Sequence, residues 1–190
     1  MYYLSGAVRP EIEHPNLGWM VTPLMGNRVG NGRVWAADTG NFTRPDLYDT
    51  PRYLSWLQSM PLGSCLFATA PDVVGDADET WERSRDVLPL IRELGIPAAL
   101  VAQDGLESVD WDSIDCLFIG GTTGWKLGWE AHRWVQEARE RDKWTHVGRV
   151  NSWRRCAKAS RWGCDSVDGT YLTFGPDTNT PKLLGWLDKL

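Results

Sequence analysis

Short apolar runs alternate with amphipathic stretches along most of this chain, and few folds accommodate such a pattern. Four continuous apolar runs, at residues 64–70, 97–102, 115–119 and 145–150, have the length of buried β-strands. Strands that are apolar on both faces and separated by helices are typical of a parallel sheet covered by helices. The sequence therefore predicts an α/β fold.

Amphipathic stretches at residues 80–94, 128–142 and 151–161 predict the helices between these strands. Gly95 and Gly163 follow two of them and are suited to end a helix. In addition, Asn151 is a candidate N-cap for the third helix.

Earlier apolar runs near residues 3–8, 19–24 and 33–37 bring the expected strand count to about eight. Eight strands predict a compact (β/α)8 barrel of the TIM type, formed by residues 1–190 as one domain, although such barrels usually have about 200–250 residues or more. The first three runs lack intervening helices, which leaves a hairpin-like N-terminal third or an incomplete barrel open. An open doubly wound sheet is the main alternative.

Composition places the chain among ordinary globular proteins, with 42% hydrophobic and 24% charged residues. No apolar run reaches the 18 or so residues of a membrane span, and residues 1–6 lack the basic start of a signal peptide. We therefore expect a cytoplasmic protein without a membrane partner. Twelve tryptophans exceed what a core of this size needs, so some of them could serve as a stacking or docking platform.

Positive charge is concentrated in residues 131–163, which carry a net charge of +6 and leave −11 for the rest of the chain. A basic patch on an acidic body suits a phosphate backbone and predicts nucleic acid as a partner. The alternative is a pair of solvated helix faces. The predicted phosphate contacts are Arg149, Arg154, Arg155, Lys158 and Arg161.

The four cysteines, Cys65, Cys116, Cys156 and Cys164, show neither C-x-C nor C-x-x-C spacing. We therefore expect no zinc site, and nothing in the sequence implies a cofactor. A disulfide framework is not expected in a cytoplasmic chain of this length.

Polar residues and glycines follow the ends of the predicted strands. In a barrel or an open α/β sheet, the carboxyl ends of parallel strands meet at one edge, where active sites assemble. A single aspartate there is often a helix cap, but several converging carboxylates favour a site. The residues in question are Asp38, Asp72, Gln103, Gly120, Gly121, Gly148 and Asp168.

These strand ends together resemble the tRNA-guanine transglycosylase family, in the family's own order along residues 34–170. Asp38–Phe42 resembles its Asp-Ser-Gly-Gly-Phe motif, and Phe118–Gly121 resembles its Gly-Gly-Leu base-binding loop. His146–Gly148 is similar to its Leu-Met-Gly strand end, and Gly163–Asp168 to its Gly-x-Asp-x-Phe-Asp segment. Asp72 and the Gln103–Gly105 segment fall where the family has a base-recognising Asp and a Gln-Gly pair.

The chain also departs from the family. It has no counterpart of the C-x-C-x-x-C zinc site, lacks Pro-Thr-Arg after the final Asp, and has about half the usual length. The resemblance is therefore to a minimal relative, such as the phage and bacterial enzymes that place 7-deazaguanines into DNA. This favours DNA over tRNA as the substrate.

The resemblance implies base exchange at a glycosidic bond, in which a free 7-deazaguanine replaces guanine through a covalent glycosyl-enzyme. Asp168 would be the nucleophile and Asp38 the general acid and base. Asp72 would hold the amide and amino edge of the purine, with Asp76 as a competing candidate. Gln103 would bind the purine carbonyl, and Asp165 would be a cap or a support. Further contacts to the base would come from Gly120, Gly121 and Gly148.

A base that leaves its stack needs aromatic partners, and Trp35, Phe42, Trp125 or Tyr171 could supply them. Two other functions use the same residues differently. The chain could be a hydrolytic glycosidase or nucleobase hydrolase in which water is the acceptor. It could also be a non-catalytic module that binds nucleic acid or a protein through a degenerate barrel.

Overall fold

Eight parallel strands close into a barrel in the computed structural model, which describes residues 1–9, 11–25, 29, 32–40 and 45–190. Each strand pairs with its sequence neighbours, and β8 pairs with β1. The expected (β/α)8 barrel is confirmed, and the open doubly wound sheet is wrong. The strands are β1 (Tyr2–Ser5), β2 (Leu17–Val21), β3 (Trp35–Ala37), β4 (Cys65–Thr69), β5 (Ala98–Ala102), β6 (Cys116–Ile119), β7 (Trp144–Val147) and β8 (Ser166–Asp168).

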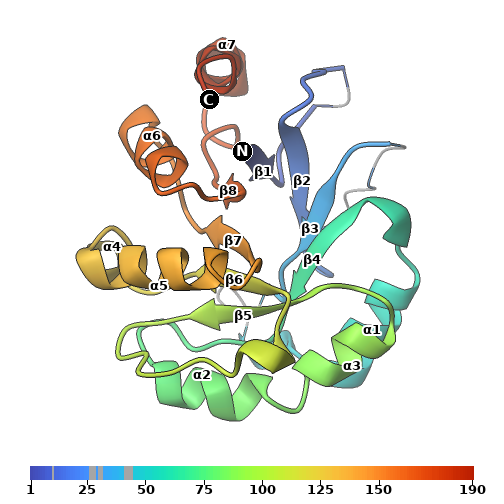
Figure 1. The fold of residues 1–190 in the computed structure, drawn as a ribbon. Coiled ribbons are helices and arrows are strands. Elements are labelled where there is room, and N and C mark those ends of the chain that lie inside the picture. The colour runs from blue at the N-terminus through green and yellow to red at the C-terminus, as the bar shows by residue number, and fades with distance from the viewer. Residues whose placement is uncertain (10, 26–28, 30–31, 41–44) are drawn as a thin grey trace.

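Helices surround the ring of strands on its outside (Figure 1). They are unevenly distributed, because no α-helix is described in the connections from β1 to β3 or between β5 and β6. The helices are α1 (Thr50–Gln58), α2 (Ala77–Ser84), α3 (Leu88–Glu93), α4 (Thr123–Lys126), α5 (Trp129–Arg139), α6 (Trp153–Arg161) and α7 (Pro176–Leu187).

The N-terminal third completes the barrel without hairpins. β1, β2 and β3 are parallel to one another, with Tyr3 opposite Leu17 and Trp19 opposite Trp35. The two alternatives left open by the sequence, a hairpin-like N-terminal third and an incomplete barrel, are therefore wrong. The apolar runs predicted the strands correctly, but pairing direction depends on the path of the connections, which apolar runs do not encode.

Two helix boundaries differ from the sequence prediction for local reasons. The stretch 80–94 forms two helices, α2 and α3, because Pro89 occupies the first turn of α3 and has no N–H to continue a preceding helix. Ser152, rather than Asn151, caps α6, since its hydroxyl accepts a hydrogen bond from Arg155 N.

The core has two layers separated by the strands. Alternate strand residues point into the barrel and outward, as the period of two requires. The inner layer comprises Leu4, Met20, Ala36, Phe67, Ala99, Val101, Cys116 and Phe118. The outer layer lies between the opposite strand faces and the helices, and it includes Trp35 of β3 and Tyr53 and Leu57 of α1. Within the described residues, no helix is long and apolar enough to cross a membrane.

Candidate active site

A cavity of about 190 Å³ opens at the carboxyl ends of the strands. Six of the seven predicted catalytic and base-binding residues line it: Asp38, Asp72, Gln103, Gly120, Gly148 and Asp168. Thr22, Gly40, Val74, Val101, Phe118 and Arg149 complete the lining. Gly121 is not among these residues.

The alternation of the strands explains why these residues converge. Val101 and Phe118 point into the barrel, so Gln103 and Gly120, two residues further on, face the same way. Ala36 places Asp38 inward by the same rule. Each side chain then lies one layer above the inner core, at the mouth of the barrel.

Asp38 is the most strongly perturbed carboxyl group of this cavity. Burial raises its pKa to about 7, with smaller contributions from the negative charges of Asp72 and Asp168. One opposing contact, a hydrogen bond of 2.6 Å from Gly40 N to Oδ1, lowers the pKa. A carboxyl group with a pKa near neutrality can both donate and accept a proton, which suits general acid–base chemistry.

Asp72, rather than Asp76, is the carboxylate that reaches the cavity. Gln103 Nε2 donates a hydrogen bond of 2.6 Å to Asp72 Oδ2, and burial raises the pKa of Asp72 to about 6. Asp76 lies on the surface and caps α2, accepting a hydrogen bond of 2.9 Å from Glu79 N.

Gln103 is completely buried and joins three segments around Asp72. Its Oε1 accepts hydrogen bonds from Gly75 N at 3.0 Å and from Gly121 N at 2.8 Å. Its amide nitrogen has two protons, and the contact to Asp72 uses one of them. Gln103 therefore orients Asp72 and ties it to the segments of Gly75 and Gly121.

The glycine pair after β6 serves the packing of the site. Gly120 N donates to Ala102 O, and Gly121 N donates to Gln103, so both amides are already used within the protein. Gly121 also has φ +69°, a backbone conformation that residues other than glycine rarely adopt. Backbone amides of this pair are therefore not directed at a ligand.

Gly148 is closely packed against Phe118 and Asp168, which leads to a prediction about its replacement. A Cβ at this position would lie 2.7 Å from Phe118 Cε1 and 3.3 Å from Asp168 Oδ1. We expect Gly148→Ala to destabilise the fold by about 1–3 kcal/mol, since the inner core must shift. Gly124→Ala is the matched control: a Cβ there meets no atom within 4 Å and lies in helix α4. Urea unfolding of both variants measures the difference, and equal stabilities would contradict this account of the packing.

Asp168 is held by two donors that both reach Oδ1. His146 Nε2 lies 3.0 Å from this oxygen, and Arg149 N donates to it at 3.3 Å. Sequence reasoning missed the role of His146, which is fully buried inside the barrel. The signal was available, because His146 and Gly148 share a strand face, as Ser166 and Asp168 do on the neighbouring strand.

Arg149 belongs to the cavity rather than to an outer surface. It has φ +59°, unusual for a residue with a side chain, and its Nη2 donates a hydrogen bond of 2.5 Å to Gly121 O. Its positive charge lowers the pKa of Asp72. The sequence assigned Arg149 to a phosphate, whereas the structure places it beside the carboxylates.

Two more of the predicted phosphate contacts stabilise loops around the cavity. Lys158 Nζ donates to Leu127 O at 2.5 Å, and Arg155 Nη1 lies 3.4 Å from Arg149 O. Lys126, which the sequence did not single out, is buried and donates to Gly148 O at 3.1 Å. Burial lowers the pKa of Lys126 to about 8, and the positive charge of Arg149 adds to this effect.

The basic residues of 131–163 do not form one face. Arg149 lines the cavity, and Arg154 lies in the first turn of α6, which follows β7. Arg139 and Lys143 lie at the opposite end of the barrel, where they border a hollow with Trp144. Arg161 is at the last turn of α6 and is therefore remote from the mouth. The net charge of a sequence segment does not show at which end of a barrel each of its residues lies.

Of the four aromatic residues predicted as stacking partners of a base, the three that the structure describes lie in different surroundings. Trp35 is fully buried in the outer core and donates to Pro61 O, so its prediction as a stacking partner is wrong. Tyr171 packs against Trp186, with ring centroids 4.5 Å apart. Trp125 follows the glycine pair and packs partly against the core. Phe42 lies outside the described residues. At the cavity itself, Phe118 is the aromatic side chain of the described lining.

Asp165 stands at the start of β8, away from the cavity. It accepts hydrogen bonds from Thr145 N at 2.7 Å and Thr145 Oγ1 at 2.9 Å, which tie β8 to β7. It is therefore a structural support and not a helix cap.

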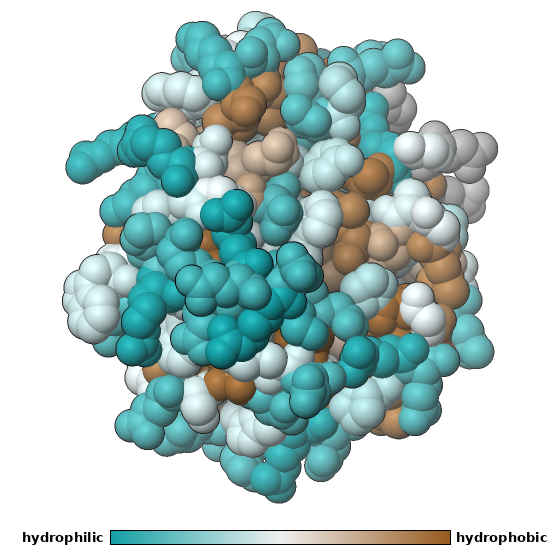
Figure 2. All heavy atoms as spheres, in the orientation of Figure 1, coloured by the Kyte–Doolittle hydropathy of each residue, from teal (hydrophilic) through white to brown (hydrophobic). Residues whose placement is uncertain are grey.

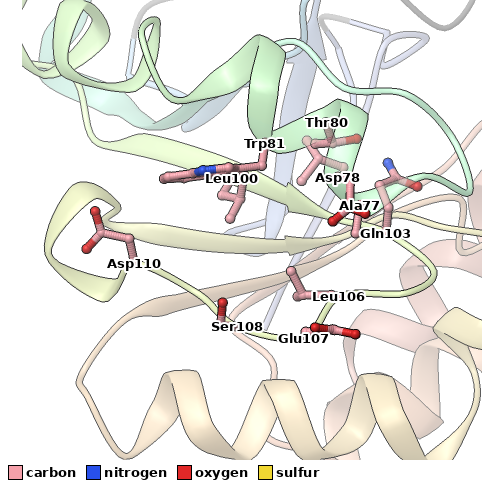
Figure 3. A pocket seen from close by; sticks show the side chains of 11 residues that line it. Ala77, Asp78, Thr80, Trp81, Leu100, Gln103, Leu106, Glu107, Ser108 and Asp110 are labelled. Atoms are coloured by element: carbon pink, nitrogen blue, oxygen red, sulfur yellow. The ribbon is translucent and has the colours of Figure 1, made fainter.

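A second cavity, of about 250 Å³, lies between α2 and the segment 103–110 (Figure 3). It lies outside the ring of strands, where no α-helix covers the connection after β5. Gln103 and Val101 line both cavities and separate them. Apart from this shared wall, the outer cavity contains none of the predicted site residues.

The cysteine thiols are separate from the site. Burial raises the pKa of Cys65 and Cys164 to about 12 and that of Cys156 to about 11, and Cys116 is fully buried. Among the described residues, no three His, Cys, Asp or Glu side chains are grouped so as to hold a metal ion.

No family model and no curated protein matches this chain. Among solved structures, it is similar to the Bacillus subtilis YkuI protein, with an EAL domain, in complex with substrate c-di-GMP and calcium. The identity is 19%, the TM-score 0.47, and the match covers 75% of this chain and 38% of that one.

Two further solved structures are similar at the same level. The FimX EAL domain of Pseudomonas aeruginosa bound to c-di-GMP has 16% identity, a TM-score of 0.46, and coverage of 73% of this chain and 61% of that one. The tryptophan synthase complex of Pyrococcus furiosus has 12% identity, a TM-score of 0.47, and coverage of 74% and 56%. The chain thus spans less than two thirds of each of these three proteins, and the likeness concerns the fold only.

Proposed function

We propose that this protein is a base-exchange transglycosylase that replaces guanine in nucleic acid, DNA in preference to tRNA, with a 7-deazaguanine. The observation that carries the proposal is the meeting of Asp38, Asp72 and Asp168 in one cavity, with the pKa of Asp38 raised to about 7. Carboxyl groups in one site but in different environments can take different roles in one reaction.

The reaction divides between two of these carboxyl groups. An oxygen of ionised Asp168 attacks C1′ and forms a C–O bond while the bond from C1′ to N9 of guanine breaks. Protonated Asp38 gives its proton to the departing base. Asp38 then removes the N9 proton of the incoming 7-deazaguanine, whose N9 attacks C1′ and releases Asp168.

The remaining polar groups suit recognition of the base. Asp72 is positioned by Gln103 and can accept hydrogen bonds from the amide and amino edge of a purine. The side chain of Arg149 can donate to a carbonyl oxygen of the base, and Gln103, fully buried, acts through Asp72. Val101 and Phe118 supply apolar contacts.

The size of the cavity suits one base rather than a whole nucleotide. Its volume of about 190 Å³ is below the roughly 300–1,000 Å³ of pockets that enclose drug-sized ligands. A base in a strand would have to turn out of its stack to enter. The sugar and phosphates would then remain at the rim.

Exposed aromatic side chains lie on connections that leave the carboxyl ends of the strands. Trp129, between β6 and β7, is 73% exposed, and Phe174, after β8, is 72% exposed. Trp153 begins α6 and packs partly against Trp186. Aromatic side chains next to cations, here the exposed Arg154, are the elements of single-strand binding. Hydrophilic side chains dominate the surface over α5 in Figure 2.

The test is exchange of labelled guanine in oligonucleotides, followed by trapping of the covalent adduct. We expect labelled guanine or 7-deazaguanine to enter DNA without net loss of bases, and an adduct to map to Asp168. Net release of guanine without exchange would indicate the hydrolytic alternative. Binding without adduct or release would indicate the non-catalytic module. Oligoribonucleotides and tRNA in parallel reactions compare the two classes of nucleic acid.

Binding of nucleic acid should depend on Arg154 more than on Arg161. Both are exposed on α6 and seven residues apart, on one helix face but roughly 10 Å apart along its axis. Arg154→Gln should reduce the slope of log affinity against log salt by about 0.7–0.9, because one phosphate contact is lost. Arg161→Gln is the control and should leave the slope unchanged. Fluorescence anisotropy at several salt concentrations measures it, and equal slopes for the two variants would contradict an interface at the rim.

A further inference from the structure

A chain of hydrogen bonds runs through the interior of the barrel to Asp168. Trp144 Nε1 donates to Ser166 Oγ at 2.8 Å, and Ser166 Oγ lies 2.8 Å from His146 Nδ1. His146 Nε2 lies 3.0 Å from Asp168 Oδ1. The four side chains come from only two strands, β7 and β8, in which His146 is paired with Ser166.

The direction of these hydrogen bonds follows from the donors available. An indole N–H can only donate, so the hydroxyl of Ser166 accepts from Trp144. The hydroxyl proton then points to an acceptor, and His146 Nδ1 is the atom within reach. A neutral imidazole with an accepting Nδ1 has its proton on Nε2, which therefore donates to Asp168.

The surroundings of His146 favour this neutral form. Burial lowers the pKa of His146, and the positive charge of Lys126 acts in the same direction, whereas Asp168 opposes both. The ring also has little freedom to turn. It lies between Phe67 and Phe118, with ring centroids at 5.0 Å and 4.4 Å.

The two oxygens of Asp168 have different partners. Both described hydrogen bonds, from His146 Nε2 and from Arg149 N, reach Oδ1. Within the described residues, none is made to Oδ2. The side chain is 18% exposed, in contrast to the fully buried His146 below it. Oδ1 is therefore anchored, and Oδ2 is the oxygen available to a substrate.

We propose that Trp144, Ser166 and His146 form a relay that positions Asp168, holding Oδ1 so that Oδ2 is the attacking atom. The importance of this position rests on the proposed function, in which Asp168 is the nucleophile. His146 touches neither base nor sugar in this role and is a positioning residue. Misplacement of a reacting group by about 1 Å can cost 10²-fold in rate, which is why such support matters.

The first arm of the test measures the histidine itself and needs no activity. ¹⁵N NMR of the imidazoles should show His146 neutral and protonated on Nε2 at pH 7. The chain has three histidines, so the signals of His146 are those missing in His146→Gln. A ring protonated on Nδ1, or on both nitrogens, at pH 7 would overturn the relay.

The second arm measures its effect on catalysis. His146→Leu should lower kcat by about 10- to 100-fold with little change in KM, because the donor to a charged acceptor is lost. His146→Gln should recover part of this loss, since its amide nitrogen can replace Nε2. Ser166→Ala should lower kcat several-fold while retaining the imidazole, which keeps the test valid if His146→Leu does not fold.

The matched control for Ser166→Ala is Ser84→Ala, a buried serine on α2 whose hydroxyl bonds a helix carbonyl. It should leave kcat unchanged. A kcat equal to that of the wild type in both His146→Leu and Ser166→Ala would contradict the positioning role of His146. Absence of exchange in the wild-type protein would instead contradict the proposed function. The NMR measurement would still test whether the hydrogen bonds of the relay exist.

Discussion

Asp168→Asn is expected to abolish base exchange, with a loss of roughly 10⁴- to 10⁶-fold in kcat, while the fold is retained. The amide has the same shape and its oxygen can still accept hydrogen bonds from His146 Nε2 and Arg149 N. It cannot attack an anomeric carbon, and removal of a catalytic nucleophile has effects of this size in other enzymes. The covalent adduct should disappear together with the exchange of labelled guanine.

The control for this variant is Asp76→Asn. Asp76 was the competing candidate for recognition of the base, but it caps α2 from the surface, and asparagine is an equally good N-cap. Asp76→Asn should therefore keep both exchange and stability. Near-normal turnover in Asp168→Asn would show that another group attacks the sugar. A loss of activity in Asp76→Asn would show that Asp76 contributes to the active site.

Asp38→Asn is expected to stabilise the protein at pH 8 while removing most of its activity. Burial raises the pKa of Asp38 from 3.8 to about 7. Below about pH 4 the carboxyl group is protonated in both folded and unfolded chains. Between pH 4 and pH 7 the unfolded chain releases this proton but the folded chain keeps it, so stability falls as pH rises. Above pH 7 the full cost of a buried charge is present.

Asparagine removes this cost and can still accept the hydrogen bond from Gly40 N. The gain in unfolding free energy should therefore grow from about zero near pH 4 to about 2–4 kcal/mol at pH 8. Loss of proton transfer should reduce exchange by about 10²- to 10⁴-fold. Urea unfolding at several pH values, combined with the exchange assay, measures both effects. A stability difference that does not vary with pH would mean that Asp38 is ionised in the folded protein throughout this range.

Some features of this protein could be predicted because they depend on local patterns. Continuous apolar runs predicted the strands of the barrel, and their polar ends marked the residues that line its mouth. The carboxyl ends of parallel strands must meet at one edge, so a one-dimensional list of strand ends is also a list of neighbours in space. This is why the sequence alone groups Asp38, Asp72 and Asp168.

Other features depend on which side chains face one another, and no local pattern contains them. In the sequence, His146 is one residue of a buried strand, and nothing near it indicates a partner. The pairing of β7 with β8 places it beside Ser166 and Asp168. Likewise, Lys126 at the end of α4 reaches Gly148 O in the connection after β7, a contact between segments 22 residues apart.

The basic segment illustrates the same limit in the opposite direction. Its residues are close in sequence but are divided between the two ends of the barrel, because each βα unit crosses the molecule twice. The sequence by itself determined the strands and the carboxylates at their ends, since both follow from residues within a few positions of each other. Only the tertiary structure decided the closure of the barrel, the burial that raises the pKa of Asp38, and the contacts that hold Asp168, because each depends on atoms that distant segments bring together.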